Sequence, residues 1–198
     1  MADRWSKAVP ATPAGKDMAA AVSEMARRVG NNAGPLDVDF DATWKDPAEA
    51  TGRRVLAVWM LAAINSPGPI VDALEAESAP VRDAAARALQ HWVALDPSRE
   101  ATYTQLLATK ADFTDGQRQM MTALVHGTTR PPAAAVVDEL FELLGYEKLP
   151  VRELARMQLA RLDPVGAKES GYDASSDRRS AQRDAWRLSW KKRHKGKQ

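Results

Sequence analysis

The sequence predicts an all-α protein made of stacked helical pairs, an α-solenoid of about four pairs. The 198 residues are rich in Ala, Leu, Val and Arg but include only three Phe and three Tyr, a composition that favours helix over sheet. An arginine-centred pattern also recurs at intervals of roughly 35 residues, as repeat architectures do. No segment alternates apolar and polar residues with the period of a half-buried strand.

The N-terminal segment lacks a helical pattern. Two prolines and a glycine stand among Ala and Thr, so we expect a flexible leader over residues 1–16. It has no apolar stretch of the kind that a signal peptide contains. Asp17 can cap an N-terminal helix that ends near Val29, where Gly30 and two asparagines supply a stop signal.

Four arginines mark the repeat, each near the start of a predicted long helix. Separated by 28, 36 and 34 residues, they are Arg54, Arg82, Arg118 and Arg152. Apolar residues follow at offsets of three, seven and ten, which lie on one helical face. This predicted buried stripe comprises Ala57, Leu61 and Ile64, then Ala85, Leu89 and Trp92, then Met121 and Val125, then Ala155, Leu159 and Leu162. In the third copy, Gly127 ends the helix early.

A shorter helical segment precedes each long helix. These segments are expected at 38–44, 70–74, 103–107 and 136–144. The joints are short, and a proline in the first turn, as at Pro80 and Pro150, is favourable because its missing N–H would have no partner there. Such pairs cannot bury their faces alone, so we predict one repeat domain over 17–164.

The C-terminal part forms a different unit. Residues 165–192 are predicted to contain a loop over 166–176 and a capping helix that Asp177 opens. Trp186 and Trp190 stand four residues apart, on one face of that helix, and we expect them to close the open end of the solenoid.

Charge is distributed unevenly along the chain. From residue 178 to 198 there are nine Lys or Arg against one Asp, a net charge of +8. The preceding 177 residues carry 19 basic and 25 acidic groups, a net charge of −6. A basic tail over 193–198 therefore follows a mildly acidic body.

Two of the repeats resemble a known family. The run Ala79–Leu89, which reads APVRDAAARAL, resembles the second helix of a HEAT repeat, and Leu149–Ala155 repeats its Pro-Val-Arg start. The resemblance extends over about Leu36–Asp163 and is poorest in the third copy, where Gln117 replaces the valine before Arg118. It implies a HEAT-like solenoid in which the arginines bond neighbouring turns and stack the repeats.

A narrower likeness is to helical-repeat modules at the C-terminal end of uncharacterised planctomycete proteins. It is carried by residues 152–155, 162–164 and 171–173 and by Trp186. Some of those modules are attached to membrane-anchored regulatory regions that control sigma factors. The longest apolar run, 55–64, is too short to span a bilayer, so we expect a soluble protein. With the resemblance to bacterial proteins, the expectation is a cytoplasmic bacterial protein or a soluble domain of a membrane-anchored one.

Signals for catalysis are missing from the sequence. There is no cysteine, which excludes disulfides, thiolate zinc sites and iron–sulfur clusters. The three histidines form no metal-binding pair, and no phosphate-loop or serine-hydrolase motif occurs. A distant alternative is an enzyme that resembles the HEAT-like lyases acting on bilin pigments. This sequence shows no dedicated nucleophile or acid–base pair for that chemistry. We therefore expect a non-enzyme without cofactor or metal.

The resemblance implies that the second helix of each pair lines a concave surface. Offsets of one, five and eight from each arginine lie opposite the apolar stripe. The residues at these offsets form the predicted partner-binding set. It comprises Trp59 from the first copy, Asp83, Arg87 and Gln90 from the second, and Glu153 and Met157 from the fourth. In the third copy they are Gln119, Ala123 and His126. The leading hypothesis is a scaffold that binds a partner protein through this face, with Trp59 alternatively covered by the N-terminal helix.

Nucleic-acid binding is the alternative function. It rests on the basic C-terminal residues Arg187, Lys191, Lys192, Arg193, Lys195 and Lys197. Phosphates or acidic lipid headgroups attract such a run, but a lysine-rich terminus can equally be a solvated end.

Overall fold

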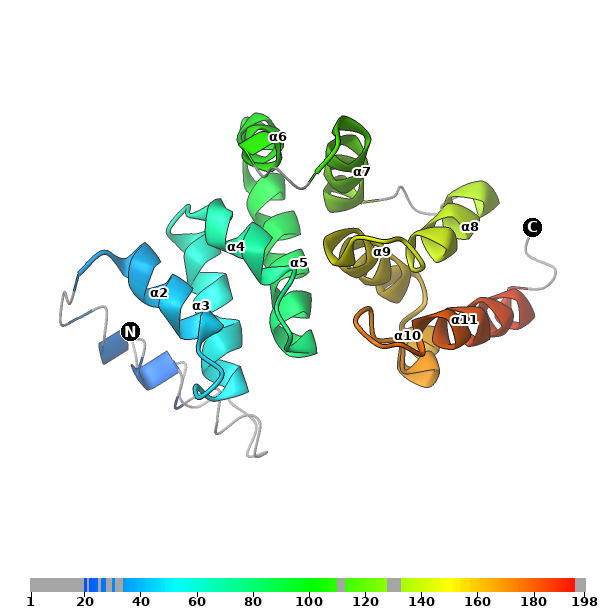
Figure 1. The fold of residues 1–198 in the computed structure, drawn as a ribbon, viewed down its shortest axis with the longest axis horizontal. Helices are drawn as coiled ribbons and strands as arrows, with labels where there is room; N and C mark the ends of the chain where they lie inside the picture. The colour runs from blue at the N-terminus through cyan, green and yellow to red at the C-terminus, as the bar shows by residue number, and fades with distance from the viewer. Residues whose placement is uncertain are drawn as a thin grey trace. The chain divides into compact units, whose positions relative to one another are not determined.

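The computed structural model describes residues 20, 22–24, 26–27, 30, 34–109, 113–127 and 133–194. Every regular element within these ranges is an α-helix (Figure 1). The predicted all-α fold class is thus confirmed. The leader, most of the predicted helix after Asp17, and Lys195 and Lys197 lie outside the described residues.

The chain divides into two compact units, residues 1–88 and 89–198. The repeat domain predicted over 17–164 extends across both. The helices described in unit 1 are α2 (Leu36–Lys45), α3 (Thr51–Ala63), α4 (Pro67–Ala73) and the first part of α5 (Ala79–Leu95). α3 packs against both α2 and α4. Their shared core includes the fully buried side chains of Phe40, Leu61 and Ile70.

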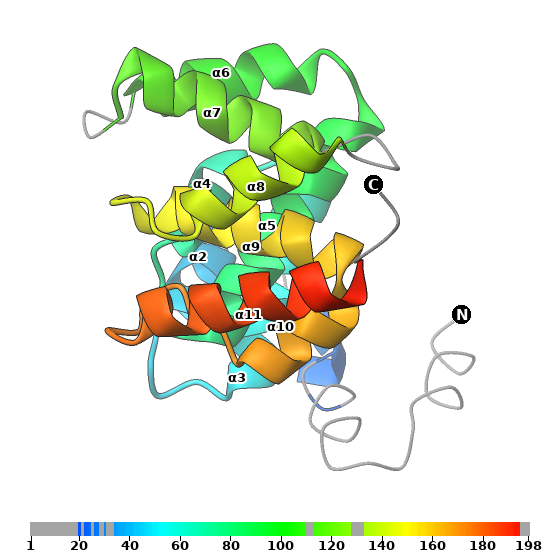
Figure 2. The ribbon, with the colours of Figure 1, turned by 90° about the vertical axis from the view of Figure 1, so that its right-hand side faces the viewer.

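Unit 2 contains the remaining turns of α5 and six further helices. These are α6 (Arg99–Thr109), α7 (Asp115–His126), α8 (Ala134–Leu143), α9 (Leu149–Leu162), α10 (Pro164–Ser170) and α11 (Arg179–Arg193). α9 packs against α7, α8 and α10, α6 packs against α7, and α11 against α10. Figure 2 shows α11 lying alongside α10.

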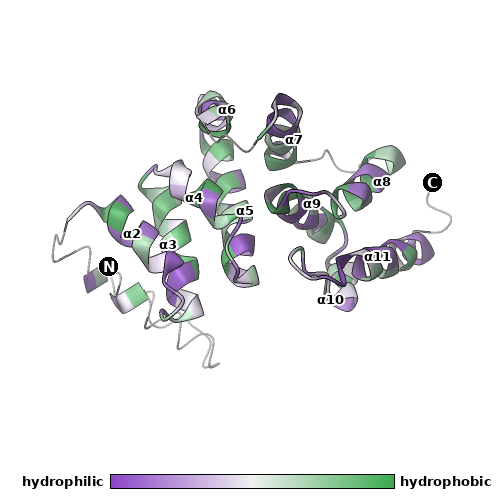
Figure 3. Ribbon diagram, in the orientation of Figure 1, coloured by the Kyte–Doolittle hydropathy of each residue, from purple (hydrophilic) through white to green (hydrophobic). Residues whose placement is uncertain are grey.

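The predicted pairing of short and long helices is present. α2, α4, α6 and α8 precede α3, α5, α7 and α9 at the expected positions. In every copy the stripe residues at offsets three and seven are buried, while Ile64 and Leu162 at offset ten are half-buried. Hydrophobic and hydrophilic residues accordingly alternate around each helix (Figure 3). Gly127 ends α7 with φ +84°, a conformation that glycine adopts without strain.

Each repeat arginine donates hydrogen bonds to carbonyl oxygens of the segment just before its helix. The bonds, 2.6–2.8 Å long, join Arg54 to Trp44, Arg82 to Ala76 and Glu77, Arg118 to Phe113, and Arg152 to Tyr146 and Glu147. Carbonyls at the end of a helix lack intrahelical partners, so the arginine supplies donors where the chain needs them. This confirms that the arginines bond neighbouring turns within each pair.

The predicted loop over 166–176 is wrong in its first part, because α10 occupies Pro164–Ser170. The Asp163 carboxylate accepts a hydrogen bond from the Gly166 backbone N–H at 3.0 Å, and Pro164 stands in the first turn. Cap and proline were both visible in the sequence. A helix of seven residues is nevertheless too short to show an apolar period.

The capping helix starts one residue later than its predicted cap implies. Arg178, not Asp177, occupies the N-cap position of α11, and no side chain caps it. Trp186 is buried as expected, edge-on to Phe141 of α8 with ring centroids 5.9 Å apart. Trp190 is only half-buried, so one tryptophan rather than two anchors this helix.

Candidate partner-binding groove

The six predicted partner-binding residues are divided between the two units. Trp59, Asp83 and Arg87 belong to unit 1, and Gln90, Glu153 and Met157 to unit 2. Glu153 and Met157 are each only 1% exposed, so neither presents a surface to a partner in this structure. The reason is packing: α9 contacts three other helices of its unit, which leaves little of its circumference open. A one-helix pattern cannot show how many neighbours a helix has.

The other members of this set are more accessible, but their polar groups have partners. Arg87 is exposed, and its Nε lies 2.8 Å from Oδ2 of Asp83, one turn earlier. The half-buried Gln90 donates to the carbonyl of Val125 at 3.2 Å. Trp59 is half-buried.

Arg187 of the predicted basic tail lies in the fold. Its guanidinium contacts two carboxylates of α8, Asp138 at 2.8 Å and Glu142 at 2.5 Å. The hydrogen bonds that its guanidinium donates to these two carboxylates, first that to Asp138, raise the pKa of Arg187. Its assignment to an exposed run is therefore corrected: it connects α11 to α8.

Arg193 is likewise held within unit 2. It contacts Asp163 at 2.5 Å and Glu169 at 2.9 Å. Of the predicted tail, Lys191 and Lys192 are the exposed cations among the described residues. The sequence shows a run of charge, but it cannot show which members meet carboxylates that are distant in the chain.

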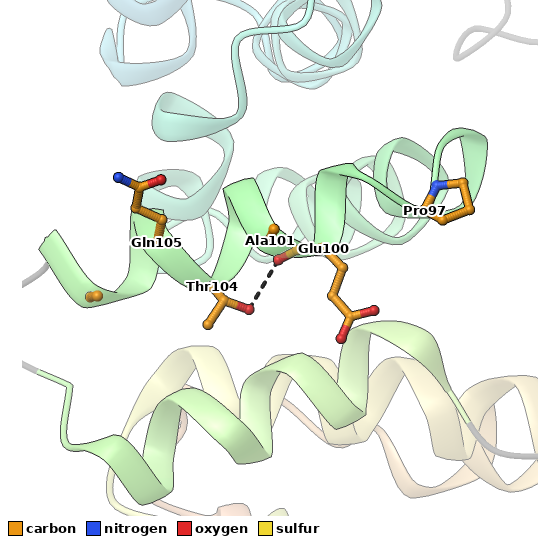
Figure 4. Close-up of a pocket in the computed structure, with 6 residues that line it drawn as sticks. Pro97, Glu100, Ala101, Thr104 and Gln105 are labelled. Atoms are coloured by element: carbon orange, nitrogen blue, oxygen red, sulfur yellow. Dashed lines mark hydrogen bonds between the residues drawn. The ribbon is translucent and has the colours of Figure 1, made fainter.

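Among the hollows bordered by described residues of unit 2, the first follows α6. It has a volume of about 560 Å³ and is lined by Pro97, Glu100, Ala101, Thr104, Gln105 and Ala108. Figure 4 shows Glu100, Ala101, Thr104 and Gln105 along α6 and Pro97 just before it. The Thr104 hydroxyl donates to the Glu100 carbonyl at 3.0 Å. With a wall on one side only, this surface holds a ligand poorly.

The second hollow lies between α6 and α7 and has a volume of about 540 Å³. Its polar side chains already have partners: Nε2 of His126 lies 3.1 Å from the Glu100 carboxylate, and Arg118 contacts Asp115. Burying these pairs under a ligand would cost desolvation without adding a new interaction.

The third hollow, which we call the α7–α8 groove, also has a volume of about 540 Å³. Residues of α7 and α8 form its walls. Both helices pack on α9 (Figures 1 and 2). Its apolar lining consists of Met120, Ala123, Leu124, Val136, Leu140 and Leu143, with Gly116 and Gly127 between them. Gln119, Glu139 and Gln158 are its polar members. Most of this surface is apolar, with few polar groups, as in binding sites generally.

Two polar groups in the α7–α8 groove retain binding capacity. Among the described residues, Glu139 of α8 has no ion-pair partner, and its side chain is exposed. Gln158 of α9 donates its amide hydrogen to the carbonyl of Leu124 at 2.7 Å, while its Oε1 accepts no bond from the part of the chain that is described. Gly127 permits this position, because a Cβ there would lie 2.9 Å from that oxygen.

The predicted third-copy residues are found in this region. Gln119, Ala123 and His126 are all exposed on α7. Gln119 and Ala123 line the α7–α8 groove and the neighbouring hollow, and His126 lines the latter. The groove residues of α8 and Gln158 were missed, because the first helix of a pair and a buried glutamine gave no signal in a one-helix pattern.

Within the described ranges, no three His, Asp or Glu side chains are grouped so that they could hold a metal ion. Among the same residues, no helix combines the length and the apolar character needed to cross a bilayer. The α7–α8 groove offers apolar contact, one carboxylate that no described cation meets and one amide oxygen, a set suited to binding. No family model, no curated protein and no solved structure matches this chain.

Proposed function

We propose that this chain is a non-catalytic interaction module of the HEAT-like solenoid type, which binds a segment of a partner protein in the α7–α8 groove. The observation that carries the proposal is the groove itself, an apolar channel with free polar groups at its rim and floor. Its volume of about 540 Å³ falls within the range of roughly 300–1,000 Å³ usual for ligand sites.

The shape of the groove favours a peptide over a compact small molecule. Its walls are helices of 12 and 10 residues, so an elongated ligand can follow them. Grooves between helices bind amphipathic segments through apolar anchors spaced along one side. Met120 and Val136, which are half-buried, provide apolar surface for such anchors.

Paired helices and joint-binding arginines support the HEAT-like part of the proposal. All four copies contain both features, and the exposed face of a second helix, α7, borders the groove. Partner binding along second helices is what the resemblance to HEAT repeats implies.

Gly116 permits a direct test of the groove. It stands in the first turn of α7, and a Cβ added to it meets no atom within 4 Å. Gly116→Arg therefore places a long side chain at the groove without disturbing the core. Gly116→Ala is the matched control, because it makes the same backbone change with almost no bulk.

The measurement is selection of a randomised peptide display library on the immobilised full chain. We expect the selected peptides to bind the wild type and Gly116→Ala alike and to bind Gly116→Arg at least about tenfold more weakly, since filling the groove removes about 1.4 kcal/mol or more of contact. A library that yields no binders, or binders indifferent to Gly116→Arg, overturns the proposal.

Nucleic-acid binding through the tail has less support. Arg187 and Arg193 contact carboxylates, which leaves Lys191 and Lys192 as exposed cations of the described part. Each lost phosphate contact lowers both affinity and its dependence on salt.

A further inference from the structure

We infer that the α7–α8 groove selects a peptide segment in which a lysine or arginine stands next to a large apolar residue. This inference rests on the proposed function and specifies the chemistry of its ligand. Two groups of the groove support it independently: the carboxylate of Glu139 and the Oε1 atom of Gln158.

The charge of α8 is only partly balanced. The helix carries Asp138, Glu139 and Glu142, and Arg187 from α11 contacts the first and the third. One guanidinium among three carboxylates leaves an excess of two negative charges along this helix. Glu139 is the carboxylate that lines the groove and has no cation among the described residues.

Nothing basic in the described lining offsets this charge. Of the lining residues, Glu139 is the charged one, and the rest are apolar, glycine or carboxamide. On α7, Asp115 and Arg118 already contact each other. An incoming cation thus meets an uncompensated carboxylate, whereas a phosphate or an acidic peptide meets a like charge.

The floor of the groove adds a hydrogen-bond requirement. The Oε1 atom of Gln158 accepts no bond within the described structure, and Gln158 itself is 2% exposed. An acceptor that no described protein group occupies can take a bond from a ligand, so a ligand that offers an N–H there gains a hydrogen bond. A peptide amide or the N–H groups of arginine supply such a donor.

The groove then recognises two neighbouring residues of the ligand, one through apolar contact and the other through charge. An apolar side chain enters between Met120 and Leu140, both in the lining, while a long basic side chain reaches the exposed Glu139 at the rim. Lysine and arginine suit this position because their aliphatic stems also pack on apolar surface.

The test compares the sequences that the same peptide display library yields on different variants of the full chain. On the wild type we expect enrichment of Lys or Arg beside an apolar residue. On Glu139→Gln this enrichment should vanish, and on Glu139→Lys acidic residues should replace the basic ones. Glu75→Gln is the control, because it removes an exposed carboxylate that does not line the groove.

Affinity provides a second reading. A selected basic peptide should bind Glu139→Gln about two- to five-fold more weakly than the wild type, the effect of one exposed ion pair. The difference should shrink in high salt.

A wild-type pool without basic residues, or a basic preference that persists in Glu139→Gln, overturns the inference. If peptides bind, and Gly116→Arg abolishes their binding, but no basic preference is found, the inference fails while the proposed function stands. If Gly116→Arg has no effect, the proposed function fails as well.

Discussion

The third and fourth helical pairs contain the same arginine signal but differ greatly in burial. In α6, which opens the third pair, two of 11 residues are buried, Tyr103 and Leu107. In α9, which closes the fourth pair, nine of 14 are buried, including the polar Glu153 and Gln158. The α7–α8 groove lies where the two pairs meet.

The difference goes with how much of each helix its neighbours cover. α9 packs against α7, α8 and α10, so that most of its surface is covered. α6 packs against α7 and presents a row of Thr, Gln and Ala to solvent. A shared repeat pattern therefore specifies that a pair forms, while position in the fold decides which of its faces remain available.

The repeat arginines of the third and fourth pairs, Arg118 and Arg152, provide the most direct test of this comparison. Arg152 is 7% exposed and bonds Tyr146, Glu147 and, through Nε at 2.8 Å, the carbonyl of Ala174. Arg152→Ala leaves these carbonyls without donors, so we expect a loss of about 3 kcal/mol in the free energy of unfolding, measured by denaturant titration.

Arg118 is the matched residue of the third pair. Its side chain is 24% exposed, and it bonds one carbonyl, that of Phe113. Arg118→Ala should cost only about 1 kcal/mol, since water can reach the site. If both substitutions lower the free energy of unfolding equally, the claim that the two pairs differ in burial is refuted.

Hydrogen exchange compares the two helices directly. Leu107 of α6 and Leu159 of α9 are both fully buried. Because α6 has little buried surface, its free energy of local opening should be about 2 kcal/mol lower than that of α9. The Leu107 amide should therefore exchange roughly thirty-fold faster than the Leu159 amide. Exchange measured by NMR at equal rates for both amides would contradict this prediction.

Two buried tyrosines predict effects of opposite sign. The Tyr172 hydroxyl donates to the carbonyl of Leu144 at 2.5 Å, whereas the Tyr103 hydroxyl has no partner in the described structure. Tyr172→Phe should cost about 1 kcal/mol, while Tyr103→Phe should be neutral or stabilise by up to about 1 kcal/mol. Thermal unfolding of both variants beside the wild type measures the sign.

Alkaline pH tests the same pair of residues. Burial raises the pKa of both Tyr103 and Tyr172. A raised folded pKa means that the stability is fully present below the unfolded pKa of about 10 and is lost as pH rises further. We expect the free energy of unfolding to fall above about pH 10, and to fall less steeply in Tyr103→Phe. A pH profile identical to that of the wild type would contradict this.

A small loss of stability is expected at Arg187. It contacts two carboxylates, but Asp138 and Glu142 are 55% and 61% exposed. Exposed pairs contribute little, so Arg187→Ala should lower the free energy of unfolding by less than about 1 kcal/mol. A loss as large as that of Arg152→Ala would show that α11 depends on this contact far more than its exposure suggests.

The sequence by itself determined the local features of this protein. Helix pairs, the buried stripe around Ala57, Leu89 and Met121, and the glycine stop at Gly127 follow from interactions within about ten residues, which periodicity and caps express directly. It also located Gln119 and Ala123 on the accessible face of α7. α10 was not predicted, because a helix of seven residues is too short to show a hydrophobic period.

Only the tertiary structure decided which of these faces are used. Burial of Met157, the pairing of Arg187 with α8, and the joining of Glu139 and Gln158 in one groove all depend on residues far apart in the chain. A pattern along one helix records which side is apolar, but not which other helices cover it. For that reason the fold class could be predicted from the residues, and the candidate groove could not.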